Sequence, residues 1–390
     1  MRVLYLTNIP SPYMVGYLNE LGKYCELQVV FEKAFDSTRP DSWKKLPVRP
    51  NFNYSILAGK SIDKKLYGDK LDSAPDDKAL SFEVVKHINR NYDFIIVANP
   101  CTPTGIIEIL YMQFHKIPYS IQSEGGYPGN GKGIKEKIKY YLMRKAEYYF
   151  STCDLDDAYF IQYGATKDRI RRYPFASICE ADLPKESIGK EERNRYKKML
   201  GISDKLMILS VGRSVHVKGF DILLQALKGI SQEVCTYFVG GKCISEYNDI
   251  IEKEQLSNIF FIDNVDYKEL KKYYYAADIF VLPTRSDTWG LVINEAMTYA
   301  IPVITTDRCV AGNALIKDGV NGYIVKTENV EQLRDALVEL MSDEKKRYQF
   351  GEYSYRVMRD WTFETMGKTV FKHIQEIVRG TDKNDFRKRI

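Results

Sequence analysis

The sequence of 390 residues has few of the residues that build metal sites and disulfide frameworks. Its seven cysteines are odd in number, scattered and never spaced as Cys-x-x-Cys, and its four histidines are equally dispersed. A disulfide scaffold is excluded, and a zinc site is disfavoured because its ligands come in closely spaced pairs. The pattern is typical of reduced, mostly buried thiols, so we expect a cytoplasmic protein without a metal cofactor.

Long apolar runs and a large excess of either charge are also missing. No stretch approaches the roughly 18 apolar residues that a membrane-spanning helix needs. The opening sequence, MRVLYLTNIP, predicts a buried strand and lacks the longer apolar stretch of a signal peptide. Lys+Arg 57 against Asp+Glu 52 leaves a net charge of +5, which is too small to indicate a nucleic-acid partner.

The chain does contain two strand–loop–helix openings, one in each half. Residues 1–7 predict a strand that leads into a helix ending at Leu21. Residues 205–211 predict a second strand, followed by loop 212–219 and a helix with one buried stripe. That stripe consists of Phe220, Leu223, Leu224 and Leu227. Because the chain is too long for one core, the repeat predicts an α/β protein of two doubly wound, Rossmann-like domains facing each other across a cleft.

The domain boundary is predicted from a change in composition. A polar, charged stretch, Glu180–Lys198, loses apolar periodicity, so we place the connector there. The N-terminal domain is therefore predicted over residues 1–178 and the C-terminal domain over residues 179–362.

Segment 284–302 has the strongest signal for a binding site. It holds two carboxylates, Asp287 and Glu295, between an apolar strand at 277–283 and another at 302–306. This is the crossover unit of a parallel sheet, and ligands bind at the carboxyl ends of such strands. Asp287 lies at that end and Glu295 lies in the following helix. The alternative is an ordinary crossover in which Asp287 caps the helix and Glu295 is solvated.

The loop after the strand at 205–211 has the composition of a phosphate site. Gly212 allows a tight turn, and Arg213 and Lys218 place two cations beside a helix N-terminus, just before Gly219. Cations, backbone N–H groups and the helix dipole favour a diphosphate and stabilise the charge it gains on departure. The alternative is a solvated basic loop, the usual role of surface Arg and Lys.

These two segments resemble the retaining nucleotide-sugar glycosyltransferases of the GT-B fold, glycosyltransferase family four. That family carries two glutamates, the first in Glu-Gly-Phe-Gly-Leu and the second in Glu-Ala-Met. Here Asp287 stands where the first glutamate is usual, and Trp289 stands where phenylalanine is. Glu295-Ala296-Met297 matches outright. Family members also carry Gly-Arg and Lys-Gly at the spacing found between Gly212 and Gly219.

The resemblance implies a donor site in the C-terminal domain. Arg213 and Lys218 would hold the donor diphosphate. Asp287 would face hydroxyl groups of the transferred sugar, and Glu295 would accept hydrogen bonds from the ribose. Main-chain groups would come from Gly212, Val265, Trp289, Gly290 and Leu291. The resemblance also implies that the final helix, about 363–380, packs back on the N-terminal domain.

The N-terminal half matches the family more loosely. Its first loop contains Ser11 and Tyr13 between prolines where a glycine-rich loop is common, and main-chain contact with the donor is predicted there. Many members have a histidine in the loop after the strand corresponding to 119–122, but this loop reads Ser-Glu-Gly-Gly. Glu124 is a candidate catalytic residue in its place, or it caps a turn.

Two further segments allow more than one interpretation. Asp154 and Asp156 have the spacing of an Asp-x-Asp metal motif, but aspartates also begin helices, and the helix start is favoured. Stretch 132–145 predicts a basic amphipathic helix around Ile134 and Ile138. It either lies against anionic lipid, which would suit a lipid-linked acceptor, or packs its apolar stripe on the core.

The combined prediction is a metal-independent, retaining hexosyltransferase. It would move a sugar from a UDP- or GDP-linked donor to a hydroxyl of a glycan or lipid-linked glycan, with no other cofactor. The family implies bacterial surface polysaccharide synthesis, such as capsule or lipopolysaccharide, in the cytoplasm or at the inner face of its membrane. Two alternatives stay open, a catalytically silent partner subunit and a nucleotide-dependent oxidoreductase. The second is disfavoured because neither opening strand is followed by Gly-x-Gly-x-x-Gly.

Overall fold

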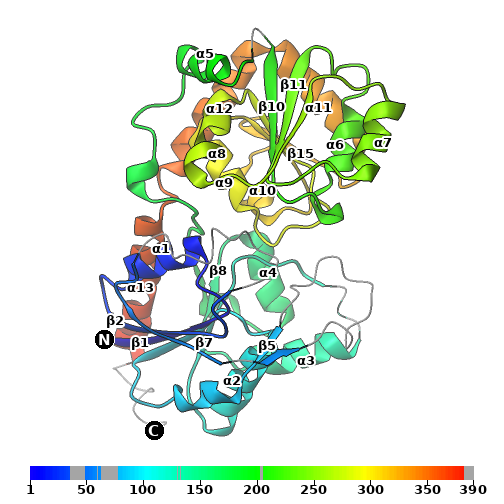
Figure 1. Cartoon of the computed structure of the whole chain (residues 1–390). Helices are drawn as coiled ribbons and strands as arrows, with labels where there is room; N and C mark the ends of the chain where they lie inside the picture. The colour runs from blue at the N-terminus through cyan, green and yellow to red at the C-terminus, as the bar shows by residue number, and fades with distance from the viewer. Residues whose placement is uncertain are drawn as a thin grey trace. The chain divides into compact units, whose positions relative to one another are not determined.

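Two parallel β-sheets with flanking helices organise the chain in the computed structural model (Figure 1). The structure describes residues 1–35, 49–58, 60–62, 78–129, 131, 133–202 and 205–381. The chain divides into unit 1, which is Met1–Glu180 with the segment from Trp361 onward, and unit 2, which is Ala181–Asp360. Among the described residues, no helix combines the length and the apolar character that crossing a membrane would require.

Unit 1 contains a seven-stranded parallel sheet of order β3-β2-β1-β6-β7-β8-β9. Its strands are β1 (Arg2–Thr7), β2 (Glu26–Phe31), β3 (Asn53–Ile56), β6 (Phe94–Val97), β7 (Ser120–Gln122), β8 (Tyr149–Ser151) and β9 (Ile170–Arg172). Its α-helices are α1 (Pro12–Leu21), α2 (Pro103–Phe114), α3 (Ile134–Met143), α4 (Asp154–Gln162) and α13 (Phe363–Thr381). A separate antiparallel pair consists of β4 (Lys60–Ile62) and β5 (Lys78–Leu80).

The first strand and the last helix both contribute to the core of unit 1. β1 is buried from Val3 to Thr7, as expected for a central strand covered by helices on both faces. Helix α13 packs against α1. It buries an apolar stripe at helical spacing, which is Met366, Val370, Ile374 and Ile377. The two ends of the described chain therefore belong to one unit.

Unit 2 contains a six-stranded parallel sheet of order β12-β11-β10-β13-β14-β15. Its strands are β10 (Leu206–Val211), β11 (Val234–Val239), β12 (Ile259–Ile262), β13 (Ile279–Leu282), β14 (Val303–Thr306) and β15 (Gly322–Val325). Its α-helices are α5 (Lys190–Met199), α6 (Phe220–Ala226), α7 (Ser245–Lys253), α8 (Tyr267–Ala276), α9 (Leu291–Thr298), α10 (Val310–Leu315), α11 (Val330–Ser342) and α12 (Glu344–Met358). The 3₁₀ helices among the described residues are η3 (Phe82–Lys86), η4 (Lys167–Arg169), η5 (Glu180–Asp182) and η6 (His216–Lys218).

The order of the unit 2 strands reverses between β10 and β13. The chain moves outward from β10 through β11 to β12, and then continues at β13 on the other side of β10. Such a switch point is where open α/β sheets bind ligands. The predicted α/β class and the two doubly wound, Rossmann-like sheets are confirmed, and the stripe from Phe220 to Leu227 is buried as expected.

The prediction of a connector over Glu180–Lys198 is wrong in part, because α5 begins within it. The buried face of α5 is made by charged residues rather than apolar ones, so periodicity does not reveal it. Arg193 donates to backbone carbonyls, including those of Tyr299 (3.3 Å) and Ala300 (3.2 Å). Lys197 lies 2.5 Å from Asp278. Buried charges are tolerated here because each has hydrogen-bond partners.

Candidate functional site

Two loops meet at the switch point of the unit 2 sheet. After β10, η6 leads to Gly219, whose φ of +69° is in the left-handed region. A Cβ on Gly219 would lie 2.0 Å from the carbonyl oxygen of Pro283, so a larger residue could not make this approach. The carbonyl oxygen of Val217 accepts hydrogen bonds from the backbone N–H of Arg285 (2.8 Å) and from Thr284 Oγ1 (2.8 Å). The β10–α6 and β13–α9 loops are therefore joined through their backbones.

Lys218 and Asp287 face each other at this junction. Nζ of Lys218 lies 2.5 Å from Oδ2 of Asp287, and only 19% and 16% of the two side chains are exposed. Gly212 lies beside them, because a Cβ on Gly212 would be 3.5 Å from Cδ of Lys218. An ammonium has three donors and a carboxylate has two acceptor oxygens, so the pair can bind a third polar group without separating.

The segment after Asp287 is fixed against the β14–α10 loop. The backbone N–H of Asp287 donates to the carbonyl of Arg308 (2.9 Å), and the carbonyl of Trp289 accepts from the N–H of Ala311 (2.8 Å). The Trp289 indole is buried and donates Nε1–H to Oδ1 of Asn294 (2.8 Å). The Trp289 side chain is therefore part of the core, and its main chain has a fixed place beside Asp287.

Gly290 begins α9 in a left-handed conformation with φ of +98°. A Cβ there would lie 2.7 Å from Sγ of Cys309, so the start of α9 also depends on glycine. Leu291 is the first residue of this eight-residue helix. Backbone N–H groups in the first turn of a helix lack partners within it, and the helix dipole favours an anion there.

Glu295 lies one turn into α9 and is half-buried. Its Oε2 accepts a hydrogen bond from the hydroxyl of Tyr274 on α8 (2.7 Å), and Tyr274 is fully buried and stacks on Tyr299. Burial raises the pKa of Glu295 from 4.5 to about 7, and the hydrogen bond from Tyr274 acts in the opposite direction. The carboxyl is thus poised to change its charge near neutral pH. Tyr274 is not evident from sequence, since nothing in its helix marks a partner on α9.

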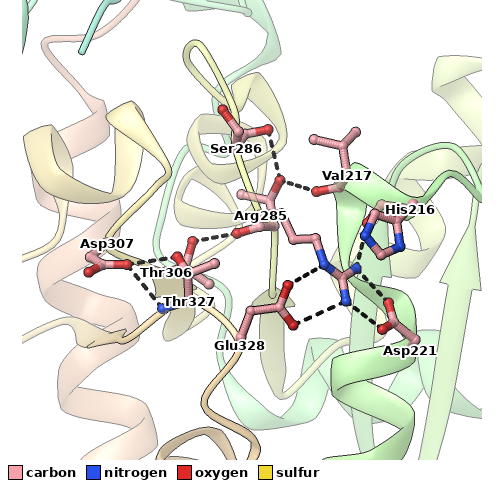
Figure 2. Close-up of polar contacts among 10 residues, drawn as sticks. His216, Val217, Asp221, Arg285, Ser286, Thr306, Asp307, Thr327 and Glu328 are labelled. Carbon is pink, nitrogen blue, oxygen red and sulfur yellow. Dashed lines mark hydrogen bonds and ion pairs between the residues drawn. The ribbon is translucent and has the colours of Figure 1, made fainter. Parts of the chain in front are cut away.

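Arg285 joins three loops and was not among the predicted site residues. Figure 2 shows its guanidinium between Asp221, Glu328 and the carbonyl of His216. It makes a bidentate pair with Asp221 (2.8 and 2.6 Å) and a second with Glu328 (2.5 and 3.1 Å). The only sequence signal is an arginine three residues after the end of an apolar strand, and arginines are common on surfaces.

Two further predicted donor residues lie on the loops that follow β10 and β12. Arg213 is exposed on the β10–α6 loop, and its carbonyl accepts from the N–H of Val215 (2.9 Å). Val265 lies on the loop between β12 and α8, and β12 is an edge strand that β11 separates from β10.

The remaining predicted residues belong to unit 1. Tyr13 and Glu124 meet there, with the Tyr13 hydroxyl 3.4 Å from Oε2 of Glu124. Ser11 is buried and its Oγ caps α1 by accepting from the N–H of Met14 (3.4 Å). Its hydroxyl is therefore engaged within the fold.

The Asp-x-Asp segment forms the first turn of α4. Asp154 pairs with Arg172, and Asp157 lies 2.6 Å from the same guanidinium. Asp156 is buried and accepts from the backbone N–H of Thr152 (3.0 Å), and burial raises its pKa to about 7. The aspartates begin a helix, which is the interpretation favoured from sequence.

A comparison with protein families decides what kind of domain unit 2 is. Residues 192–357 match the family model described as "Glycosyl transferases group 1". Over this stretch, which is most of unit 2, the chain is similar to the group 1 glycosyltransferases. Lys218, Asp287 and Glu295 all lie within it.

Relatives with curated descriptions are similar to this chain over part of their length. Spore coat protein SA of Bacillus subtilis is 34% identical over 182 residues, which are 43% of this chain and 48% of that protein. A 41.2 kDa protein in the cps region of Klebsiella pneumoniae is 28% identical over 215 residues, 54% of this chain and 56% of that protein. The chain thus spans about half the length of the curated relatives it matches.

Solved structures resemble the chain over most of its length. The Anabaena protein HepE, crystallised with UDP, has a TM-score of 0.76 and 16% identity, covering 96% of this chain and 100% of that chain. HepE has also been crystallised with UDP-glucose (TM-score 0.74). At this identity the likeness shows a shared fold, the GT-B fold with its two Rossmann-like domains.

Proposed function

We propose that the protein transfers a sugar from a nucleoside diphosphate, UDP or GDP, to a hydroxyl group of a glycan or lipid-linked glycan. The observation that carries this proposal is the Lys218–Asp287 pair at the switch point of a glycosyltransferase domain. A cation and a carboxylate side by side suit a ligand with a charged diphosphate next to a hydroxylated sugar. The complexes of HepE with UDP and UDP-glucose support the same class of donor.

The residues of unit 2 take these roles in the proposal. Lys218 and Arg213 bind the diphosphate, and Lys218 stabilises the negative charge that it gains as the sugar leaves. Asp287 accepts hydrogen bonds from the transferred sugar, and Glu295 accepts them from the ribose. Main-chain groups of Gly212, Val265, Trp289, Gly290 and Leu291 contact the donor.

The chemical step is a substitution at the anomeric carbon with retained configuration and without a metal. The bond from the anomeric carbon to the diphosphate oxygen breaks, and a bond to the acceptor oxygen forms. The acceptor's proton passes to the departing phosphate. Residues 1–178 with helix 363–380 bind the acceptor in this proposal, with Ser11, Tyr13 and Glu124 on that side, and residues 179–362 bind the donor.

A role in bacterial surface polysaccharide synthesis, such as capsule or lipopolysaccharide, fits the relatives. One of them is a protein in a cps region and another is a spore coat protein. We place the enzyme in the cytoplasm, where nucleotide sugars are made available to such pathways, with a peripheral site on the inner membrane face.

Helix α3 supports the membrane contact. Ile134, Ile138 and Tyr141 are 75%, 48% and 46% exposed, so the alternative of packing on the core holds only for Leu142 among the apolar residues of this stripe. Only the end of the helix, Leu142 and Met143, is buried. Lys135, Lys137, Arg144 and Lys145 of the same segment are exposed. Lys139 is half-buried with its ammonium over the rings of Tyr159 and Tyr163, and Lys132 lies outside the described residues. Exposed apolar residues among cations suit an anionic lipid surface.

Ile138→Glu is expected to weaken binding to phosphatidylglycerol vesicles about tenfold or more, because burying an isoleucine contributes roughly 1.5–3 kcal/mol. Co-sedimentation measures this partition. Val338→Glu on α11 is the matched control, since Val338 is 44% exposed and lies in unit 2, and it should bind like the wild type. Equal binding by the Ile138 variant, or none by the wild type, would rule out this surface.

The donor is tested by thermal stabilisation with a panel of UDP- and GDP-sugars. A bound donor at a hundred times its Kd adds about 2.7 kcal/mol to the free energy of unfolding, so a clear rise in Tm is expected for at least one compound. NAD should give no rise in Tm, whereas a rise with NAD would favour the oxidoreductase alternative. Donor binding without any hydrolysis or transfer would favour the silent partner subunit. No stabilisation by any nucleotide sugar would contradict the proposed function.

A further inference from the structure

We propose that Arg285 is a positioning residue that sets the spacing of Lys218 and Asp287 and thereby the affinity for the donor diphosphate. The inference rests on the proposed function and adds a residue to that same site. Arg285 does not touch the ligand in this proposal. It acts by holding the two loops that carry the ion pair.

Arg285 connects the loop that carries Lys218 with the loop that carries Asp287. Its backbone N–H donates to the carbonyl of Val217, the residue before Lys218 (2.8 Å). Its own loop reaches Asp287 two residues later. Nη1 of Arg285 donates to the carbonyl of His216 (2.6 Å), so η6 is held at both His216 and Val217 (Figure 2).

The guanidinium itself is held firmly. Its side chain is 14% exposed and that of Asp221 is 9% exposed, so their bidentate pair is largely shielded from water. Asp221 belongs to the first turn of α6, which starts directly after Gly219. The planar fork of arginine can satisfy Asp221, Glu328 and a carbonyl at once, and a lysine ammonium cannot reproduce that geometry.

The third loop of this network, between β15 and α11, carries a sign of strain. Glu328 has a φ of +66°, a left-handed conformation that costs energy in any residue except glycine. Its two carboxylate oxygens nevertheless bind the Arg285 guanidinium. The backbone of Glu328 is strained, yet both of its carboxylate oxygens bind Arg285. The side-chain contact, rather than a backbone preference, therefore accounts for a glutamate at this position.

Thr306 and Asp307 make further hydrogen bonds between the loops around Arg285. Thr306 Oγ1 donates to the carbonyl of Thr284 (2.6 Å), and Asp307 Oδ1 accepts from the N–H (3.0 Å) and hydroxyl (2.7 Å) of Thr327 (Figure 2). The loop that carries Glu328 is thus anchored to the loop after β14. Arg285 is the residue at which all three loops converge.

The test compares Arg285→Lys with Arg193→Lys. Both replace a mostly buried arginine in unit 2, but Arg193 bonds carbonyls that precede β13 and β14, at the opposite edge of the same sheet. Calorimetric titration with UDP and with GDP, alongside Tm, is the measurement. For the nucleotide that the wild type binds, Arg285→Lys should raise Kd about tenfold. Arg193→Lys should keep Kd within twofold of the wild type, even if its Tm falls as much as that of Arg285→Lys. Because lysine keeps the charge, the loss reports on positioning.

Glu328→Gly gives an independent reading if Arg285→Lys is too unstable to study. Glycine relieves the left-handed strain, so Tm should change little, while loss of the carboxylate should still raise Kd severalfold. Nucleotide binding that is unchanged in both variants would overturn the positioning role. A wild type that binds neither UDP nor GDP would instead contradict the proposed function itself.

Discussion

Replacing Lys218 by methionine is expected to lower kcat/KM for the donor about a hundredfold or more. Loss of one fixed group that stabilises developing charge typically costs 10²–10³ in rate, or roughly 3–4 kcal/mol. Lys218 meets this condition because it is mostly buried and held 2.5 Å from Asp287. Steady-state transfer kinetics with the donor identified by thermal stabilisation measure the effect, and kcat should fall as well as affinity.

Lys228→Met is the matched control for Lys218→Met. Lys228 also forms an ion pair, 2.6 Å from Glu254, but its side chain is exposed and lies after α6 at the other edge of the sheet. Exposed pairs contribute about 0–1 kcal/mol, so this variant should keep wild-type kinetics. Combining Lys218→Met with Asp287→Asn should cost less than the sum of the single losses, because the two groups act as one unit. Independent, additive effects, or a Lys218 variant within threefold of wild type, would refute a shared role.

Glu295→Gln is expected to stabilise the fold at pH 8 while removing donor binding. The folded carboxyl has a pKa raised to about 7 by burial, against an ordinary value of 4.5. Between those values the folded chain keeps a proton that the unfolded chain has lost, so the free energy of unfolding falls as pH rises through this range. Glutamine does not titrate, so the free energy of unfolding of the variant does not fall for this reason. At pH 8 the variant should therefore be more stable by about 1–3 kcal/mol, since a tenfold change in proton affinity is worth 1.4 kcal/mol.

Urea unfolding of both proteins at pH 5 and pH 8 measures that difference, which should nearly vanish at pH 5. Donor affinity of the wild type should decline below about pH 7, because the proposed contact with the ribose needs the carboxylate. Tyr274→Phe should move this decline to higher pH, since the Tyr274 hydroxyl donates to Glu295 and favours its charged form. A Glu295→Gln variant that still binds donor, or that shows the wild-type pH profile of stability, would exclude this account.

Sequence predicts the framework of unit 2 well because its elements are defined by local patterns. β10, β11 and β13 are short apolar runs, and α6 carries its apolar residues at helical spacing. The same local reasoning brings Lys218 and Asp287 to one edge, because each follows a neighbouring parallel strand. Helix α5 is not predicted by this reasoning, because Arg193 and Lys197 occupy the buried positions that apolar residues would normally take.

The supporting residues of the site could not be predicted in this way. Arg285 meets Asp221 and Glu328 across 64 and 43 residues of chain, and Tyr274 meets Glu295 across 21. These contacts depend on how three loops and two helices pack, which no local period encodes. Helix α3 is a different case. Its composition allows two interpretations, and the sequence does not indicate that Ile134 and Ile138 are exposed in the fold.

The division of the chain also bears on how the protein is made. Residues 181–360 form unit 2 as one continuous stretch, whereas unit 1 needs both the first 180 residues and the helix beginning at Phe363. On the ribosome, all of unit 2 is synthesised before the closing helix of unit 1, so unit 2 can finish folding first. Until then the face of α1 that receives α13 remains uncovered, a natural point of recognition for chaperones.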